Sequence, residues 1–215
     1  MGQWIDLTHP VYDHMPVWPG DRPVQVEDVM TVPKDGCSVQ RIVMGNHVGT
    51  HVDAPAHFVA NGQTVDTLPL QALTGPARLI SVPRKERQVI AREDLEAPLA
   101  MWQGCKRLIL HTGWDIRFTS FSFYQEFPVL TFEAAEYLAG LGLYLLGMDT
   151  PSPSPIDDPG QRIHKVLLGA GTVLVESMAN LSALSPGEID VCVLPLPLGK
   201  ASGSPCRAMG RSCGH

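Results

Sequence analysis

Three histidines and an aspartate lie close together in the first third of the chain: His47, His51, Asp53 and His57 fall within eleven residues. Imidazole and carboxylate groups are the ligands that zinc, manganese and iron prefer in proteins. A single histidine beside valine and alanine is more often a hydrogen-bonded, partly buried residue than a ligand. Four such groups at this density, in a chain with only 18% charged residues, instead predict a divalent metal site.

The residues between these groups disfavour a helix. Val48, Thr50 and Val52 are β-branched and Gly49 is a poor helix former, while Pro55 favours an extended conformation in the residue before it. An extended segment therefore positions the candidate ligands.

In an extended segment, His51 and Asp53 point to the same side because they are two residues apart. His47 and His51 would then lie ~13 Å apart, which is too far for one metal ion. We therefore expect a bend at Gly49 that brings the two imidazoles together.

The pattern His-x-Gly-Thr-His-x-Asp-Ala-Pro-x-His-Phe, from His47 to Phe58, resembles the signature of the cyclase-like metal-dependent hydrolases. This family includes bacterial kynurenine formamidase (arylformamidase) and isatin hydrolase. Similar segments occur in the expected order along the whole chain, and they are residues 5–8, 16–21, 35–37, 73–77, 164–168, 175–176, 180–181 and 203–208. On this basis the chain is identified as a member of the family.

The resemblance implies a ligand set. His47, His51 and Asp53 would bind a first metal ion, and Asp53 and Glu176 would bridge to a second ion completed by His164. Zn²⁺ is the expected ion, in one or two copies, with Mn²⁺ as the alternative. Without the resemblance, His164 could face solvent on a short helix and Glu176 could simply end a strand. However, a carboxylate after a buried apolar run needs a partner such as a cation.

The resemblance also implies that His57 is the general acid/base rather than a ligand. A metal-activated water would attack the carbonyl carbon of a small aromatic substrate, and His57 would deliver a proton to the leaving amine. The expected reaction is hydrolysis of a C–N amide bond of the kynurenine formamidase type, from N-formylkynurenine to kynurenine and formate, in tryptophan catabolism. The alternatives are ring opening of isatin-like lactams, cyclic imides or lactones, and a non-catalytic metal-binding protein, although His57 argues against the last.

Substrate choice is expected to depend on two proline-containing segments. In the arylformamidase branch, the aromatic residue equivalent to Trp18 lines the substrate pocket; the alternative is a tryptophan packed beside the neighbouring prolines. Residues 150–160 contain four prolines and predict a surface loop. This loop departs from the simpler stretch of kynurenine formamidase, and loops near a site commonly set its specificity.

Short apolar runs bounded by turn residues predict the strands that must hold this site. They are Trp4–Leu7, Val24–Val29, Val39–Asn46, Ala77–Val82, Leu108–His111, Leu143–Met148, Thr172–Glu176 and Val191–Leu194. Helices are expected at Ala91–Met101, at Thr131–Leu141 with Thr131 as the cap, and from Arg162 to Gly169. These elements predict a single α/β domain over residues 1–215 with a mainly β core flanked by a few helices. The resemblance implies that the core is barrel-like, of the swivelling β/β/α type.

Composition excludes several partners. The net charge of −6 and the lack of a basic run argue against nucleic acid, and the lack of a long apolar stretch or a signal peptide argues against a membrane. Five scattered cysteines indicate reduced thiols and a cytoplasmic location. The spacing of Cys206, Cys213 and His215 matches no common zinc module and is typical of a frayed terminus. The family suggests a homo-oligomer, either a dimer or a tetramer.

Overall fold

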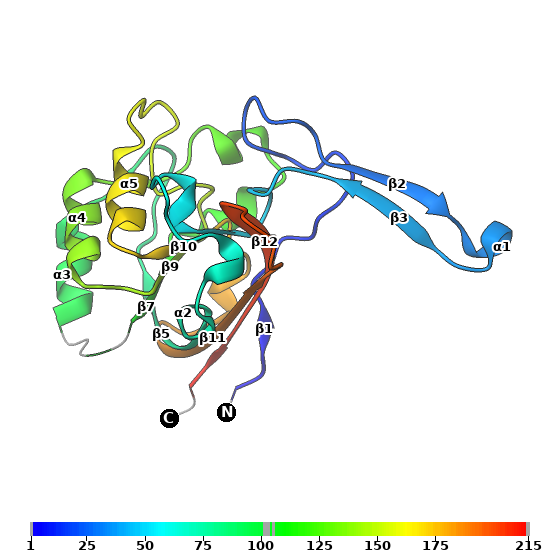
Figure 1. Ribbon diagram of the computed structural model, residues 1–215. Coiled ribbons are helices and arrows are strands. Elements are labelled where there is room, and N and C mark those ends of the chain that lie inside the picture. The colour runs from blue at the N-terminus through cyan, green and yellow to red at the C-terminus, as the bar shows by residue number, and fades with distance from the viewer. Residues whose placement is uncertain (1, 101–103, 105, 214–215) are drawn as a thin grey trace.

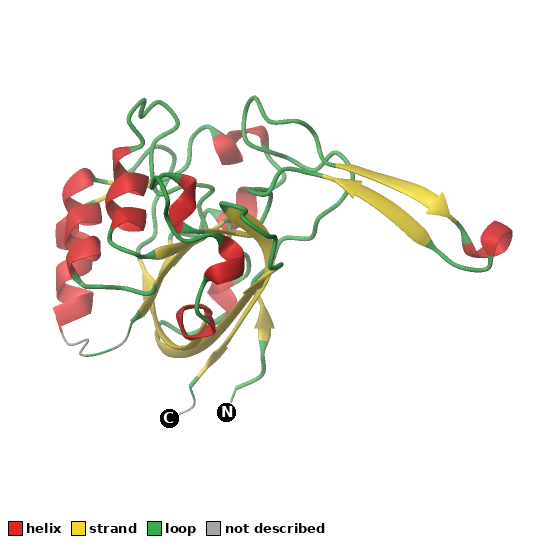
Figure 2. Ribbon diagram, in the orientation of Figure 1, coloured by secondary structure: helices red, strands yellow, loops and turns green. Residues whose placement is uncertain are grey.

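The computed structural model describes residues 2–100, 104 and 106–213, and a closed β-barrel lies at its centre (Figures 1 and 2). Hydrogen bonds connect the strands in the order β12-β11-β5-β7-β9-β10-β4, and β4 pairs with β12 again to close the ring. The barrel strands are β4 (His51–Asp53), β5 (Thr74–Ser81), β7 (Arg107–His111), β9 (Leu145–Met148), β10 (Val173–Glu176), β11 (Gly187–Pro195) and β12 (Gly203–Ser212). The predicted fold class, a barrel-like β core with a few helices, is confirmed.

The barrel is mixed. Strands β5, β7, β9 and β10 are parallel neighbours, whereas β4, β11 and β12 pair antiparallel to theirs. Helices α3 (Arg92–Ala100), α4 (Phe132–Gly140) and α5 (Arg162–Gly169) lie along the side of the barrel that carries the parallel strands (Figure 1).

The continuous apolar run in β7 follows from this arrangement. Ile109 packs inside the barrel, while Leu108 and Leu110 pack under the helices. A strand that is buried on both faces has no polar face to alternate with.

In α4, the predicted cap is present, because the Thr131 hydroxyl accepts a hydrogen bond from the Ala134 amide.

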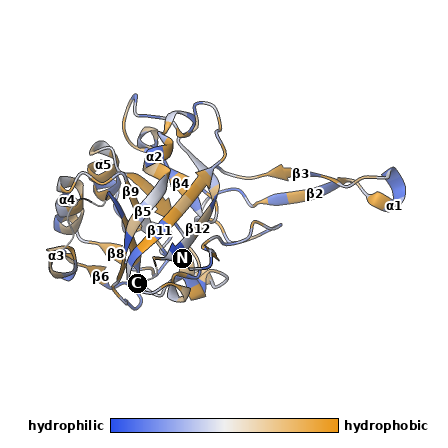
Figure 3. Cartoon of the chain, turned by 90° about the horizontal axis from the view of Figure 1, so that it is seen from below, coloured by the Kyte–Doolittle hydropathy of each residue, from blue (hydrophilic) through white to orange (hydrophobic). Residues whose placement is uncertain are grey.

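A two-stranded arm projects far from the barrel (Figures 1 and 3). It consists of β2 (Gln25–Met30), the short helix α1 (Val32–Asp35) and β3 (Val39–Val43). Apolar side chains on it are exposed, among them Val29, Val32 and Ile42. This segment is called the arm below.

Two barrel strands are absent from the sequence-based prediction, β4 and β12. The prediction of a frayed terminus is wrong for Cys206, because this residue is buried in β12. The sequence of β12 contains Gly203, Pro205 and two arginines, so it lacks the alternation that indicates a strand.

The other short elements are β1 (Ile5–Asp6), β6 (Val89–Ile90), β8 (Val129–Leu130), α2 (Leu70–Leu73) and the 3₁₀ turns Pro55–His57, Val65–Thr67, Asp115–Arg117, Phe121–Tyr124 and Leu181–Ala183. Within the described part of the chain, no helix is long and apolar enough to cross a membrane.

Candidate metal centre

The antiparallel pair β4 and β10 brings the first three candidate ligands together. His51 lies directly opposite Glu176 in the register of this pair, and Asp53 follows two residues after His51 on the same strand. The Nε2 atom of His51 lies 3.2 Å from Asp53 Oδ1 and 3.4 Å from Glu176 Oε2. All three side chains are buried. The predicted same-side placement of His51 and Asp53 is therefore present.

The predicted bend is also present. Gly49 has a φ of +61°, in the left-handed region that glycine adopts without strain, and the ring centroids of His47 and His51 lie 5.3 Å apart. The same bend brings the Gly49 carbonyl oxygen to 2.9 Å from His51 Nδ1. Because a carbonyl only accepts hydrogen bonds, Nδ1 carries a proton, and Nε2 faces the two carboxylates.

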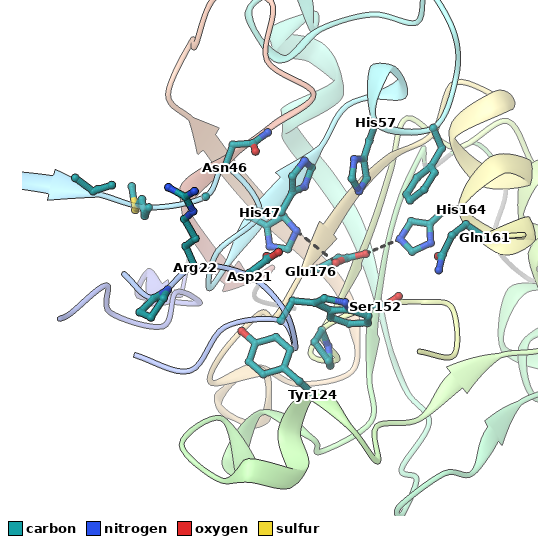
Figure 4. Close-up of a pocket in the computed structure, with 18 residues that line it drawn as sticks. Asp21, Arg22, Asn46, His47, His57, Tyr124, Ser152, Gln161, His164 and Glu176 are labelled. Atoms are coloured by element: carbon teal, nitrogen blue, oxygen red, sulfur yellow. Dashed lines mark hydrogen bonds and ion pairs between the residues drawn. The ribbon is translucent and has the colours of Figure 1, made fainter. Parts of the chain in front are cut away.

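His164 reaches the same carboxylates from helix α5 (Figure 4). Its Nε2 atom lies 3.2 Å from Glu176 Oε1 and 3.8 Å from Asp53 Oδ2. Its Nδ1 atom hydrogen-bonds the Ser154 hydroxyl at 2.8 Å. The side chain is buried, which excludes the alternative of a histidine that faces solvent.

His47 approaches from the loop before β4. Its Nδ1 atom lies 2.6 Å from Asp53 Oδ1, and its Nε2 atom hydrogen-bonds the Ser202 hydroxyl at 3.0 Å. A Cβ atom on Gly203 would clash with the His47 ring, 2.8 Å from Nδ1, and would lie 2.6 Å from the Val52 carbonyl oxygen. Only glycine therefore fits between β4 and this ring.

His57 lies at the edge of the cluster, on the 3₁₀ turn after β4. Its ring stacks on His47 with centroids 3.9 Å apart, and its Nε2 atom is 4.0 Å from Asp53 Oδ2. Its side chain is 28% exposed, whereas those of His51 and His164 are 6% exposed. His57 is thus the more accessible imidazole and the one farther from the carboxylates.

The pKa values of His51 and His57 are shifted in opposite directions by their surroundings. Burial lowers the pKa of His51, but hydrogen bonds and charge from Asp53 and Glu176 outweigh it and raise that pKa to about 10. For His57, burial dominates over the attraction of Asp53 and lowers the pKa to about 4. In each case the balance between desolvation and nearby carboxylates sets the direction.

The donor set fits a divalent cation. Imidazole nitrogens and carboxylate oxygens converge in a buried space, where two negative charges need a positive partner. The outer nitrogens of His51 and His164 are held by the Gly49 carbonyl and the Ser154 hydroxyl. Metal-binding histidines are typically oriented in this way by a second hydrogen bond. Neither Ser154 nor Ser202 stands out in the sequence as part of the site.

A cavity of about 700 Å³ opens above the cluster, which is large enough for a small aromatic molecule. Trp18 lines it and also packs edge-on against Tyr124 and near Phe127, with ring centroids 6.2 and 5.9 Å apart. Other lining residues are Asp21, Arg22, Pro23, Val43, Met44, Gly45, Asn46, His47, His51, His57, Phe58, Tyr124, Pro151, Ser152, Gln161, His164 and Glu176.

The loop over residues 150–160 is only partly the predicted surface loop. Residues 150–154 are buried, and Pro151 and Ser152 line the cavity. Ser154 supports His164. The first half of this loop is therefore a wall of the site.

A second group of metal-binding side chains lies away from the cavity, and it consists of His111, Asp115 and Asp149. The Asp149 carboxylate accepts hydrogen bonds from the Thr112 amide and hydroxyl and from the amides of Gly113 and Trp114. These bonds give it a structural role in holding the turn after β7. In the C-terminal tail, Cys206 is buried, while His215 lies outside the described residues.

Known proteins match this chain over most or all of its length. The family model described as "Putative cyclase" matches residues 5–155. The kynurenine formamidase of Geobacillus thermodenitrificans is 36% identical over 100% of both chains. A solved structure of a potential metal-dependent hydrolase with cyclase activity is 27% identical, with a TM-score of 0.80 over 98% of each chain. Isatin hydrolase A from Labrenzia aggregata shares the fold, with a TM-score of 0.86 and 23% identity over 98% of this chain and 93% of its own. The chain belongs to the cyclase family of metal-dependent hydrolases.

Proposed function

We propose that this enzyme hydrolyses the C–N bond of an aryl formamide, with N-formylkynurenine as the substrate and kynurenine and formate as the products. The observation that carries the proposal is the buried cluster of histidines and carboxylates at the floor of an aromatic-walled cavity. It is supported by a relative, named kynurenine formamidase, that is 36% identical over the full length.

The proposed ligands are His47, His51, Asp53, His164 and Glu176. The Glu176 carboxylate lies within 4 Å of imidazole nitrogens of His51 and His164. The Asp53 carboxylate lies within 4 Å of those two imidazoles and of His47, which supports two ions with Asp53 and Glu176 between them. We propose Zn²⁺, because nitrogen and carboxylate donors in a compact site suit it, with Mn²⁺ as the second choice. A bound divalent cation supplies an acidified water molecule and polarises the substrate carbonyl.

His57 is the proposed proton carrier. Its position at the cavity edge gives its Nε2 atom access to both the attacking water and the leaving nitrogen. The imidazole accepts the proton that the water loses and then donates it to the arylamine nitrogen as the C–N bond breaks. The aromatic ring of the substrate is proposed to pack against Trp18, which is held in place by Tyr124 and Phe127.

Ring opening of an isatin-like lactam is the second candidate, because the fold of isatin hydrolase A covers nearly the whole chain. A substrate panel separates the two. We expect the zinc-loaded protein to turn over N-formylkynurenine with a kcat/KM at least ten times higher than for isatin, a cyclic imide or a lactone. A higher kcat/KM for the lactam would contradict the formamidase proposal and support the ring-opening reaction. If the protein hydrolyses none of these compounds, the result would support a non-catalytic metal-binding protein.

We further propose a homodimer, in which the arm packs on a second copy of this chain. A two-stranded ribbon alone is only marginally stable in water, and the arm exposes Val29, Val32 and Ile42 on an element that does not pack against the barrel (Figure 3). Light scattering should give twice the chain mass, and Ile42→Asp should shift it to the monomer, while Leu70→Asp, at another exposed apolar residue that lies outside the arm, should not. A monomeric wild type would overturn the proposal.

We also propose that the protein is located in the cytoplasm with reduced thiols, since the described cysteines are free.

A further inference from the structure

Two charged side chains outside the proposed ligand set line the cavity, Asp21 and Arg22. Figure 4 shows both on the His47 side of the cluster, away from His164 and Gln161. They therefore lie at one end of the cavity.

The backbone that carries them is fixed on both sides. The Asp21 amide donates a hydrogen bond to the Trp18 carbonyl at 3.0 Å, which closes a turn in which Gly20 has a φ of +98°. Pro23 restricts Arg22 to an extended conformation, and the next residue, Val24, is fully buried. The turn that places Trp18 in the wall thus also places the two charges.

Both side chains are exposed. Among the described residues, neither has a side-chain hydrogen bond or ion pair, either with the other or with a third residue. Other polar groups in the lining are already used: Asn46 donates to Ser202, Gln161 donates to a backbone carbonyl, and Tyr124 donates weakly to another.

The charge of Asp21 acts on the cavity. Burial raises the pKa of the Tyr124 phenol, and the charges of Glu176 and Asp21 raise it further. Asp21 and Tyr124 line the same cavity, so the negative charge of Asp21 lies near this phenol.

We propose that Arg22 and Asp21 bind the two charges of an α-amino acid group on the substrate, the carboxylate by Arg22 and the ammonium by Asp21. This rests on the proposed function and deepens it: Arg22 and Asp21 are the residues that would select a substrate with a charged amino acid group over an uncharged lactam. An arginine fork matches a carboxylate with two parallel hydrogen bonds. In an α-amino acid, the ammonium and the carboxylate are attached to the same carbon atom. Their charges are therefore close enough together for the side chains of two adjacent residues to bind them.

The test compares N-formylkynurenine with N-formylkynuramine, the same aryl formamide without the carboxylate. We expect wild-type kcat/KM to favour the former, and Arg22→Gln to reduce that preference by ~10–100-fold, the loss expected for one hydrogen-bonded charge. The change should lie mainly in KM, and Arg22→Lys should restore part of it. Asp21→Asn should weaken both substrates, because both keep the ammonium. Arg87→Gln, at an exposed arginine outside the cavity lining, is the control and should leave the preference unchanged.

Calorimetric binding of the products kynurenine and kynuramine gives a readout that does not need turnover. Tighter binding of kynurenine to wild type, lost in Arg22→Gln with the metal content retained, supports the inference even if hydrolysis fails. Equal binding of both products, or an unchanged preference in Arg22→Gln, would overturn it. Hydrolysis of N-formylkynurenine without any preference for the carboxylate would overturn this inference and leave the proposed function standing.

Discussion

At the scale of single residues, the site separates imidazoles by their surroundings. His51 and His164 each have one ring nitrogen held by the protein and the other directed at two buried carboxylates. His57 has no such second bond to any residue that the structure describes, and it stacks on His47 at the more exposed edge of the cluster. The same side chain type can therefore serve as a ligand or as a proton carrier, depending on what holds it.

Replacement of His57 tests this division of roles. His57→Ala should leave the metal content per chain unchanged and lower kcat by ~10²–10⁴-fold, the usual contribution of a general acid/base. Elemental analysis and formate release measure the two quantities. His14→Ala, at an exposed histidine outside the cavity, is the matched control and should change neither. Loss of metal in His57→Ala would mean that His57 is a ligand.

The sequence allows part of the site to be predicted. His47, His51 and Asp53 could be grouped because they are neighbours on one strand and the bend before it. His164 and Glu176 come from distant elements, so only the family resemblance connects them to the others. Ser154 and Ser202 could not be found at all, because a serine that orients a histidine has no local pattern and depends on the final arrangement of the chain.

At the scale of elements, the strand pairing that closes the barrel also forms part of the candidate site. Strand β12 pairs with β4 in the register Gly203 with Asp53 and Pro205 with His51, so the barrel seam runs through the candidate ligands. Apolar runs do not indicate either strand, because β4 has only three residues and β12 mixes glycine, proline and arginine with apolar residues. The extended conformation of β4 was predicted only from its β-branched residues and Pro55. The buried parallel strands were predictable because their apolar runs are continuous.

Gly203→Ala tests the seam. The added Cβ would meet the His47 ring and the Val52 carbonyl oxygen, so β12 must move away from β4. We expect a loss of about 1–3 kcal/mol in the free energy of unfolding, as for other overpacked sites, together with weaker metal binding. Urea unfolding and a competitive chelator titration measure these. In Gly199→Ala the new Cβ meets no atom within 4 Å, so this control should remain near wild type; equal behaviour of the two variants would contradict the account.

At the scale of the whole molecule, stability should depend on pH through His9. Burial lowers the pKa of His9 to about 4, against the attraction of Asp115, and its Nε2 atom is buried without a partner among the described residues. In the unfolded chain, His9 binds a proton near pH 6.5, whereas in the folded chain it stays neutral down to about pH 4. The contribution of neutral His9 to the free energy of unfolding is therefore complete above pH 6.5, and it decreases as the pH falls toward 4.

His9→Phe should remove this part of the acid sensitivity, because it keeps the stacking on Phe118, where the ring centroids lie 3.7 Å apart. Between pH 7 and 5, we expect the variant to lose roughly 1–2 kcal/mol less unfolding free energy than wild type, after allowance for the partial exposure of His9. Urea unfolding at each pH measures the difference. Parallel pH profiles for the two proteins would exclude His9 as the cause.

The fold as a whole, a β barrel with helices on one side, could be anticipated from apolar runs and the family resemblance. The arm could not, since its strands were predicted without any indication that they leave the body of the protein. The proposed dimer would explain its exposed apolar residues, because a second chain would cover them.

Formate release from N-formylkynurenine during metal titration tests the central claim most directly. The metal-stripped protein should be inactive, and added Zn²⁺ should restore turnover in proportion to the ions bound, with a plateau at one or two per chain. Turnover by the metal-free protein, or no release of formate at the plateau, would contradict metal-dependent amide hydrolysis at this site.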